Sequence, residues 1–205
     1  MSKKKKLTGE QALAAAFAEV DHAPLLKALG VELSDELLCL ALTHRSFANE
    51  NGHLPNNERL EFLGDAVLGL SVAAKLYDKY PSRPESDISK MRASIVSRYG
   101  LSDVAREIGV GDHILLGKGE QATGGRDNDS ILADTTEAIL GAIYRQHGFE
   151  VARGVVLKLF AAKIDNAVVS GRHMDWKTTL QELCADCLLY TSDAADDALR
   201  VDHGG

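Results

Sequence analysis

The sequence predicts an all-α protein, and three observations support this fold class. Only four prolines occur in 205 residues, so few positions bar a helix. Apolar residues recur at helical spacing through much of the chain, whereas the alternating runs that are typical of strands are scarce. Apolar residues make up 45% of the chain, which is ordinary for a globular protein with one core or two small ones.

The N-terminal part predicts a basic arm followed by two helices. Residues 1–9 contain a run of lysines and are expected to be disordered. A helix is expected from about 10 to 29, ending at Gly30, and a second from 35 to 48 with Ser34 as its N-cap.

The stretch NNERLEFLGDAVLGL predicts the third helix, which runs to about Tyr80 after a polar loop at 49–56. The two prolines of PSRPESD end this helix, because proline has no N–H to donate within a helix. A fourth helix is expected to begin at Ser86 or Asp87 and to end near residue 109.

Residues 109–130 are glycine-rich and polar, and they predict a connection between helices. They lack the Gly-Lys-Ser/Thr ending of a phosphate-binding P-loop, and no strand precedes them. The next helix covers SILADTTEAILGAIYRQH, with Gly148 as its stop. A last helix covers about 149–169, and 170–175 form a linker.

Charge and cysteine content exclude several classes of protein. The net charge of −7 argues against a protein that coats nucleic acid, but not against a nuclease with an acidic metal site. Cys39 is expected in the core, and Cys184 and Cys187 lack the second pair that would complete a zinc site. No apolar run is long enough to span a membrane, so a cytoplasmic protein with no membrane partner is expected.

Three carboxylates share one face of the third predicted helix. Glu58, Glu61 and Asp65 fall within about 60° of one another at helical spacing. The apolar residues of the same stretch fall on the opposite side: Leu60, Leu63, Val67 and Leu70. No lysine lies on the acidic face, so it is either a solvated surface or the site of a divalent cation.

The helix from residue 130 repeats this arrangement. Asp134 and Glu137 share one face, and apolar residues lie on the other: Leu132, Ile139 and Ile143. Gly69 follows the first acidic group by one turn, and Gly141 follows Glu137 by one turn. Because glycine within a helix costs about 1 kcal/mol relative to alanine, both glycines indicate close approach of another backbone. The two acidic faces are therefore expected to converge.

Converging carboxylates suit a hard divalent cation with oxygen ligands, of which Mg²⁺ is the first choice. Such an ion can activate water and stabilise charge on a phosphoryl oxygen. A di-iron centre would need Glu-x-x-His pairs, which the sequence lacks. Two solvated acidic faces remain the alternative.

The stretch NERLEFLGDAVL resembles the signature of bacterial ribonuclease III. ALTHRSFANE before it, and SDISKMRASIV and SILADTTEAILGAIY after it, resemble the same family in order and spacing. The resemblance covers about residues 20–183 and implies an all-helical endonuclease domain, taken as residues 10–170. It also implies a homodimer that hydrolyses double-stranded RNA to 5′-phosphate and 3′-hydroxyl ends, in rRNA, mRNA and tRNA processing.

The resemblance implies a role for each acidic residue. Glu61, Asp134 and Glu137 match the ligands of Mg²⁺, for which Mn²⁺ can substitute, and Asp65 and Glu137 match the catalytic residues. In the implied mechanism, water activated by the metal attacks phosphorus in line, and Asp65 holds or activates the water.

Glu58 and Glu85 match further acids that line the RNA-binding valley. Glu85 lies in PESD, where pattern alone predicts loop surface. His44 and Arg45 of THRS remain open between a buried polar contact and a contact with the RNA backbone.

The sequence departs from the family pattern in two places. Where the family often has basic residues before SILAD, Arg126 is accompanied by Asp127 and Asp129. Residues 171–183 are expected to be a linker and the start of a double-stranded RNA-binding domain that is otherwise largely missing. Residues 184–205 are expected to be an aberrant or disordered tail, with a natural short tail as the alternative.

Two rival functions are a catalytically inactive RNA-binding protein of the same fold and a carboxylate–metal protein that is not a nuclease. Retention of the acidic residues argues against the first, and the lack of histidine ligands argues against the second. An RNA-cleaving enzyme is therefore the leading prediction.

Overall fold

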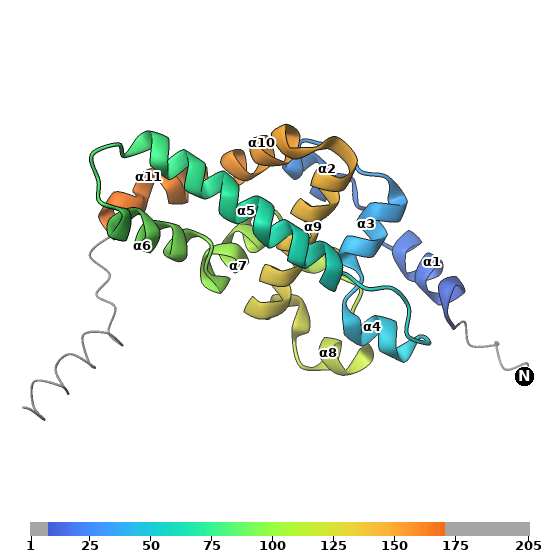
Figure 1. Cartoon of the computed structure of the whole chain (residues 1–205). Coiled ribbons are helices and arrows are strands. Elements are labelled where there is room, and N and C mark those ends of the chain that lie inside the picture. Colours follow the sequence, from blue (N-terminus) through green and yellow to red (C-terminus); the bar gives the residue numbers. More distant parts are fainter. Residues whose placement is uncertain (1–7, 171–205) are drawn as a thin grey trace, which may run out of the picture. The chain divides into compact units, whose positions relative to one another are not determined.

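Only helical elements are present among residues 8–170, which are the part of the chain that the computed structural model describes (Figure 1). Within these residues, the one β-type pairing is a parallel bridge between Thr43 and Leu115. The predicted all-α class is confirmed. The chain divides into units 1–168 and 169–205, and the fold described below is that of the first. The predictions for residues 1–7 and 171–205 lie outside the described residues.

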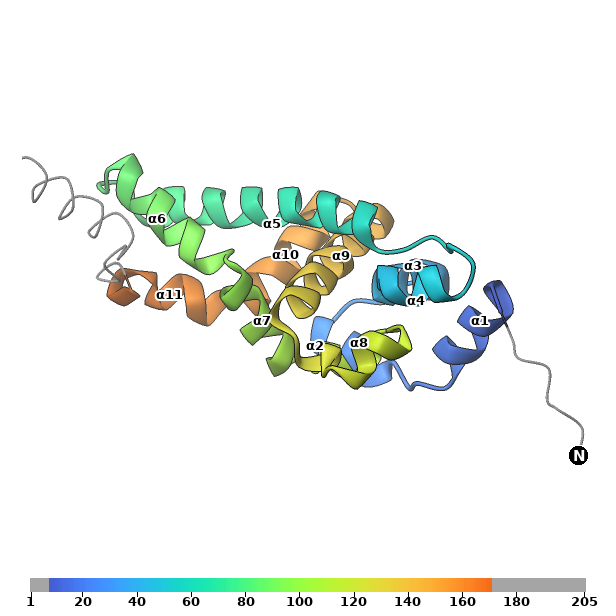
Figure 2. The same ribbon diagram turned by 90° about the horizontal axis from the view of Figure 1, so that it is seen from below.

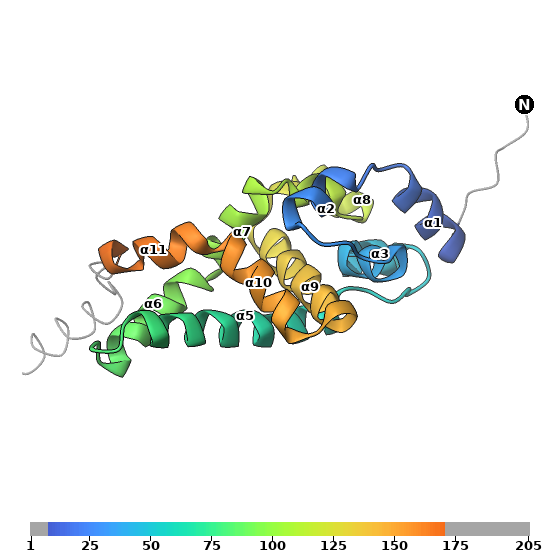
Figure 3. The same cartoon turned by 90° about the horizontal axis from the view of Figure 1, so that it is seen from above.

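The core is built around α9 (Asp129–His147), which α5 (Glu58–Lys79) crosses along much of its length. The shorter helices α3 (Asp35–Leu42), α7 (Arg98–Glu107) and α10 (Phe149–Leu159) pack against other sides of α9. Figure 2 shows α5 as one long helix, and Figure 3 shows α10 lying beside α9. Because α9 is covered on several sides, its position is fixed by packing from many directions.

Two glycines allow α5 and α9 to come close together. A Cβ added to Gly64 would lie 2.5 Å from the carbonyl carbon of Glu137, and one added to Gly141 would lie 3.0 Å from the carbonyl carbon of Leu60. Gly69 instead faces open space, so the prediction that it marks a close approach within the chain is wrong. Gly64 has that role, five residues earlier on the side that faces α9.

The first two predicted helices are each divided in two. The first consists of α1 (Glu10–Ala18) and α2 (Ala23–Leu29). It breaks before α2, because Oδ1 of Asp21 accepts a hydrogen bond from the N–H of Ala23 and a proline follows. The second breaks after α3, where Thr43 is extended and pairs with Leu115, and the chain restarts as α4 (Arg45–Glu50).

The fourth predicted helix is also divided, into α6 (Glu85–Ile95) and α7. Ser97 accepts a hydrogen bond from the N–H of Gly100 and caps α7. The start of α6 is Glu85 and not Ser86 or Asp87, because extended Pro84 takes the N-cap position.

The connection at 109–130 contains short helical pieces: η1 (Val110–His113), α8 (Lys118–Ala122) and η2 (Gly125–Asp127). The last predicted helix breaks at buried Phe160, beyond which α11 (Ala161–Ser170) begins.

Three side chains expected in the core are not fully buried. Leu70 is 57% exposed, and Leu63 and Cys39 are half-buried. The apolar face predicted for α9 is buried as expected. The register of its two acidic groups opposite that face therefore follows from packing.

Candidate metal centre

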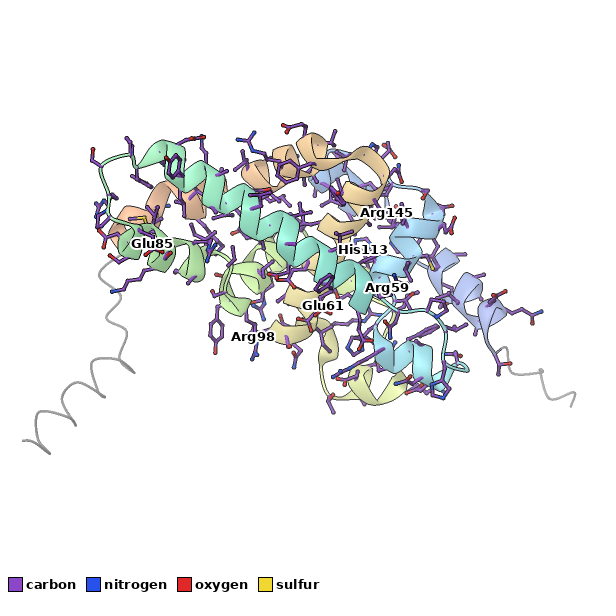
Figure 4. All side chains as sticks on the ribbon, in the orientation of Figure 1. Arg59, Glu61, Glu85, Arg98, His113 and Arg145 are labelled. Atoms are coloured by element: carbon purple, nitrogen blue, oxygen red, sulfur yellow. The ribbon has the colours of Figure 1, made fainter. Side chains whose placement is uncertain are left out.

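The crossing of α5 and α9 brings together carboxylates that are far apart in the sequence. Glu61 on α5 and Asp134 and Glu137 on α9 each offer an oxygen atom, and these atoms all lie within 4.8 Å of one another. Glu61 lies near the N-terminal end of α5 in Figure 4, where that helix passes over α9. The expectation that the two acidic faces converge is therefore realised in the fold.

Burial and mutual repulsion make this cluster costly without a cation. Burial is the largest cause that raises the pKa of Glu137 to about 8, and the charges of Asp65, Asp134 and Glu61 raise it further. Burial also raises the pKa of Glu61 and that of Asp134. The three residues make no ion pair with Lys or Arg in the described part of the chain. Three half-buried oxygen donors of like charge fit a hard divalent cation.

Asp65 and Glu58 lie on the same helix as Glu61 but are more exposed. Asp65 is one turn further along α5, and its charge acts on both Glu61 and Glu137. Glu58 is the first residue of α5, and its Oε1 lies 3.9 Å from Nη1 of Arg45 in an exposed ion pair. Such a pair contributes little to stability, so both carboxylates are free to meet a ligand.

Glu85 lies away from the cluster. It is exposed at the start of α6, and Figure 4 shows it at the opposite end of α5 from Glu61. Within one copy of the chain, the structure therefore does not bring Glu85 to the cluster of Glu61, Asp134 and Glu137.

A pocket of about 120 Å³ adjoins the cluster. Its walls combine hydrogen-bond donors with acids: His44, Arg45, Asn57, Glu58, Glu61 and Asp134. The sequence analysis did not identify Asn57, which is 2% exposed and whose Nδ2 has no hydrogen-bond partner among the described residues. The only sequence signal was its position directly before Glu58.

The two aspartates that precede SILAD, Asp127 and Asp129, form ion pairs with Arg106. Nε of Arg106 donates to Oδ1 of Asp127 at 2.7 Å, and its Nη2 donates to Oδ1 of Asp129 at 2.8 Å. Arg126 donates to the backbone carbonyls of residues 111–112, so its guanidinium already has partners. This stretch serves to fix the N-terminus of α9.

The family model described as Ribonuclease-III-like matches residues 34–164. The chain belongs to the ribonuclease III family. It is 74% identical over 201 residues to Ribonuclease 3 of Corynebacterium glutamicum. That alignment covers 98% of this chain and 81% of the relative. It is 72% identical over 184 residues to Ribonuclease 3 of Corynebacterium diphtheriae, covering 90% of this chain and 74% of that protein.

A solved structure agrees with this membership of the ribonuclease III family. The nuclease domain of Campylobacter jejuni ribonuclease III matches with a TM-score of 0.65 at 42% identity, over 70% of this chain and 98% of that one. The predicted enzyme class, a ribonuclease III endoribonuclease, is confirmed by these relatives. Among residues 8–170, no helix has the length and apolar character needed to cross a membrane.

The match to the C. glutamicum relative extends into residues 184–205, because it covers 98% of the chain. The sequence analysis found no family resemblance there. The expectation of an aberrant tail stays a prediction.

Proposed function

We propose that this ribonuclease III hydrolyses double-stranded RNA, with Mg²⁺ or Mn²⁺ held by Glu61, Asp134 and Glu137. The observation that supports this most strongly is the convergence of these carboxylates at the crossing of α5 and α9. A hard cation prefers such oxygen ligands. The two glycines let two acidic helices approach closely, and a basic or uncharged site would not require that arrangement.

Glu61, Asp134 and Glu137 would hold a divalent cation, which when bound would lower the pKa of water and stabilise negative charge on a phosphoryl oxygen. The protein would supply these ligands from two helices whose backbones approach closely at Gly64 and Gly141. Exposed Asp65, one turn from Glu61, orients the attacking water and accepts its proton. Glu137 serves as a ligand, and Asp65 is the neighbouring charge that raises its pKa most strongly. The products are a 5′-phosphate and a 3′-hydroxyl.

The active form is proposed to be a homodimer. Three large apolar side chains on α5 face solvent in the single chain: Phe62 is 80% exposed, Leu70 57% and Tyr77 73%. Gly69 on the same helix has open space above it, which leaves room for a second backbone. The C. jejuni relative has a region involved in dimer formation. Two acid clusters related by a two-fold axis would cut both strands of a duplex.

Glu58 and Glu85 are proposed to line the RNA-binding valley. Both side chains are exposed and make no buried contact that would occupy them. Since Glu85 is remote from the cluster in its own chain, a shared valley needs a second copy of the chain.

The decisive test is cleavage of a labelled RNA duplex, in Mg²⁺ and in chelator, by the wild type and by Glu137→Gln. We expect the substitution to abolish cleavage and to leave the circular dichroism spectrum unchanged, because it removes one ligand and little volume. Glu150→Gln, the same change at an exposed residue of α10, is the matched control and should cleave normally. Near-wild-type cleavage by folded Glu137→Gln would refute the assignment. Binding without cleavage by the wild type would favour the inactive RNA-binding alternative.

A further inference from the structure

The break between α3 and α4 holds two walls of the pocket beside the metal centre. The N–H of His44 donates to the carbonyl of Leu115 at 3.1 Å, and the N–H of Asn57 donates to the carbonyl of Thr43 at 3.0 Å. The same extended segment therefore fixes the backbone of both His44 and Asn57. A continuous helix, as the sequence pattern predicted, would not present either residue in this way.

Hydrogen bonds fix which nitrogen of His44 carries the proton. The N–H of Ser46 donates to Nδ1 of His44 at 3.2 Å, so Nδ1 is an acceptor. Ser46 Oγ lies 2.7 Å from Nδ1 and accepts from the N–H of Gly117 at 2.9 Å, so its own hydrogen is directed to Nδ1. The proton of the neutral ring therefore sits on Nε2. Nε2 is the remaining polar atom of this pocket-lining side chain.

Asn57 adds a second donor without a partner. Its side chain is nine-tenths buried or more, and Nδ2 has no acceptor among the described residues. Buried donors are nearly always paired, so an unpaired one in a pocket wall indicates a missing acceptor. Arg45 contributes a positive charge at the rim, with 68% of its side chain exposed.

The two sides of the pocket therefore carry different chemical groups. One side offers the donors of His44, Asn57 and Arg45, and the other offers the carboxylates that are proposed to hold the metal. An uncharged apolar ligand would leave these donors unpaired, and a free cation would be repelled by Arg45. A group with several anionic oxygens satisfies both sides, because its oxygens accept hydrogen bonds and also face the metal.

We propose that this pocket binds a phosphate group of the RNA backbone next to the metal centre, with His44 Nε2 and Asn57 Nδ2 as hydrogen-bond donors and Arg45 as the counter-charge. The inference rests on the proposed function and assigns the substrate contact that the carboxylates themselves cannot make. His44 has two separate tasks: Nδ1 caps α4, and Nε2 binds substrate.

Two substitutions separate these tasks. His44→Asn keeps an acceptor that can cap α4 but is too short to place a donor where Nε2 lies. His44→Gln keeps a donor near the Nε2 position and loses the cap. A purely structural role predicts that His44→Asn is the better enzyme of the two. Phosphate binding predicts the reverse order, with His44→Asn reduced about tenfold to a hundredfold in kcat/KM.

Asn57→Leu provides an independent test with a different signature. Leucine has nearly the same shape as asparagine, and the substitution removes an unpaired buried donor. We expect a melting temperature equal to or above that of the wild type, together with weaker cleavage. A residue needed only for folding would not give a more stable and less active protein.

The experiment measures kcat/KM on an RNA duplex in Mg²⁺, the Kd of the same duplex in chelator by fluorescence anisotropy, and the melting temperature. We expect His44→Asn and Asn57→Leu to raise Kd and lower kcat/KM, with melting temperatures no lower than that of the wild type. Wild-type kcat/KM and Kd in both folded variants would overturn the phosphate pocket and leave the proposed function standing. A wild type that binds the duplex but does not cleave it in Mg²⁺ would overturn the proposed function, while the Kd values would still decide the pocket.

Discussion

Replacing Gly64 by alanine adds one methyl group where α5 crosses α9, and the structure indicates how much must move. The new Cβ would lie 2.5 Å from the carbonyl carbon of Glu137 and 3.0 Å from the N of Gly141. The carbonyl oxygen of Glu137 would lie closer still, and an ordinary contact begins at 3.4 Å, so the two helices must separate by more than about 1 Å. The obstacle is backbone on a helix packed from several sides, so no side-chain rotation can relieve it.

The expected loss in the free energy of unfolding is about 3 kcal/mol, at the upper end of the usual range for overpacked cores. The activity should fall further than the stability, because a displacement of about 1 Å at catalytic groups can cost about a hundredfold in rate. The new methyl group presses against the backbone of Glu137, so the carboxylate of this proposed metal ligand is displaced with it. Urea unfolding followed by circular dichroism gives the first quantity, and cleavage of duplex RNA gives the second.

Gly154→Ala is the matched control, since Gly154 is an exposed residue within α10 with open space above it. That variant should gain about 0.5–1 kcal/mol from reduced backbone freedom in the unfolded chain. Both variants are compared at one protein concentration, because the proposed dimer would make unfolding concentration-dependent. A Gly64→Ala protein as stable as Gly154→Ala would show that the helices do not cross as described.

Two further predictions concern the exposed face of α5 and a buried pair of imidazoles. Phe62→Asp should convert the proposed homodimer to a folded monomer in light scattering. Tyr99→Asp, a change at an exposed aromatic residue on α7, should leave the dimer intact. A dimeric Phe62→Asp protein would contradict the proposed interface. His22 and His113 place their Nδ1 atoms 3.1 Å apart, and burial lowers the pKa of both. Below about pH 6.5 these two imidazoles bind more protons in the unfolded chain than in the folded one, so their contribution to the free energy of unfolding should fall as pH drops through that range. His113→Asn should show a smaller fall, and an identical pH dependence would refute this reasoning.

The two longest helices could be predicted from the sequence because their signals are local and sustained. Asn128 accepts hydrogen bonds from the N–H groups of Ser130 and Ile131 and so caps α9, and Gly148 follows its last residue. The acidic faces of α5 and α9 follow from spacing alone, and their convergence follows once both apolar faces are buried in one core. That is why the spatial cluster, though not the role of each residue, could be anticipated.

The breaks in the other helices depend on contacts that no local pattern contains. Thr43 leaves the helix to pair with Leu115, which is distant in the sequence, and neither residue indicates that pairing by type. His44 then caps α4 through its ring, a role usually taken by Ser, Thr, Asp or Asn. The site residues that the sequence analysis left ambiguous are those placed by this break.

The face of α5 was misjudged because small residues carry little hydropathy. The side toward α9 contains Gly64 and Ser71, both buried, whereas the larger Leu70 is 57% exposed. A pattern based on apolar side chains therefore rotates the predicted core face toward Leu70. Close helix crossings are where this error is expected, because they select small residues over apolar ones.

Several features that reduce the stability of this fold lie where α5 crosses α9. Like charges are half-buried at Glu61, Asp134 and Glu137, and Asn57, the N-cap residue of α5, has a side-chain donor with no acceptor among the described residues. None of these features helps the chain to fold, and each would be relieved by a ligand: the carboxylates by a cation, and the amide by an anionic oxygen. A ligand that binds only the folded state stabilises it in proportion to its affinity. The same unfavourable groups that lower the stability of the empty protein would therefore give the proposed metal centre and its pocket their affinity for metal and phosphate.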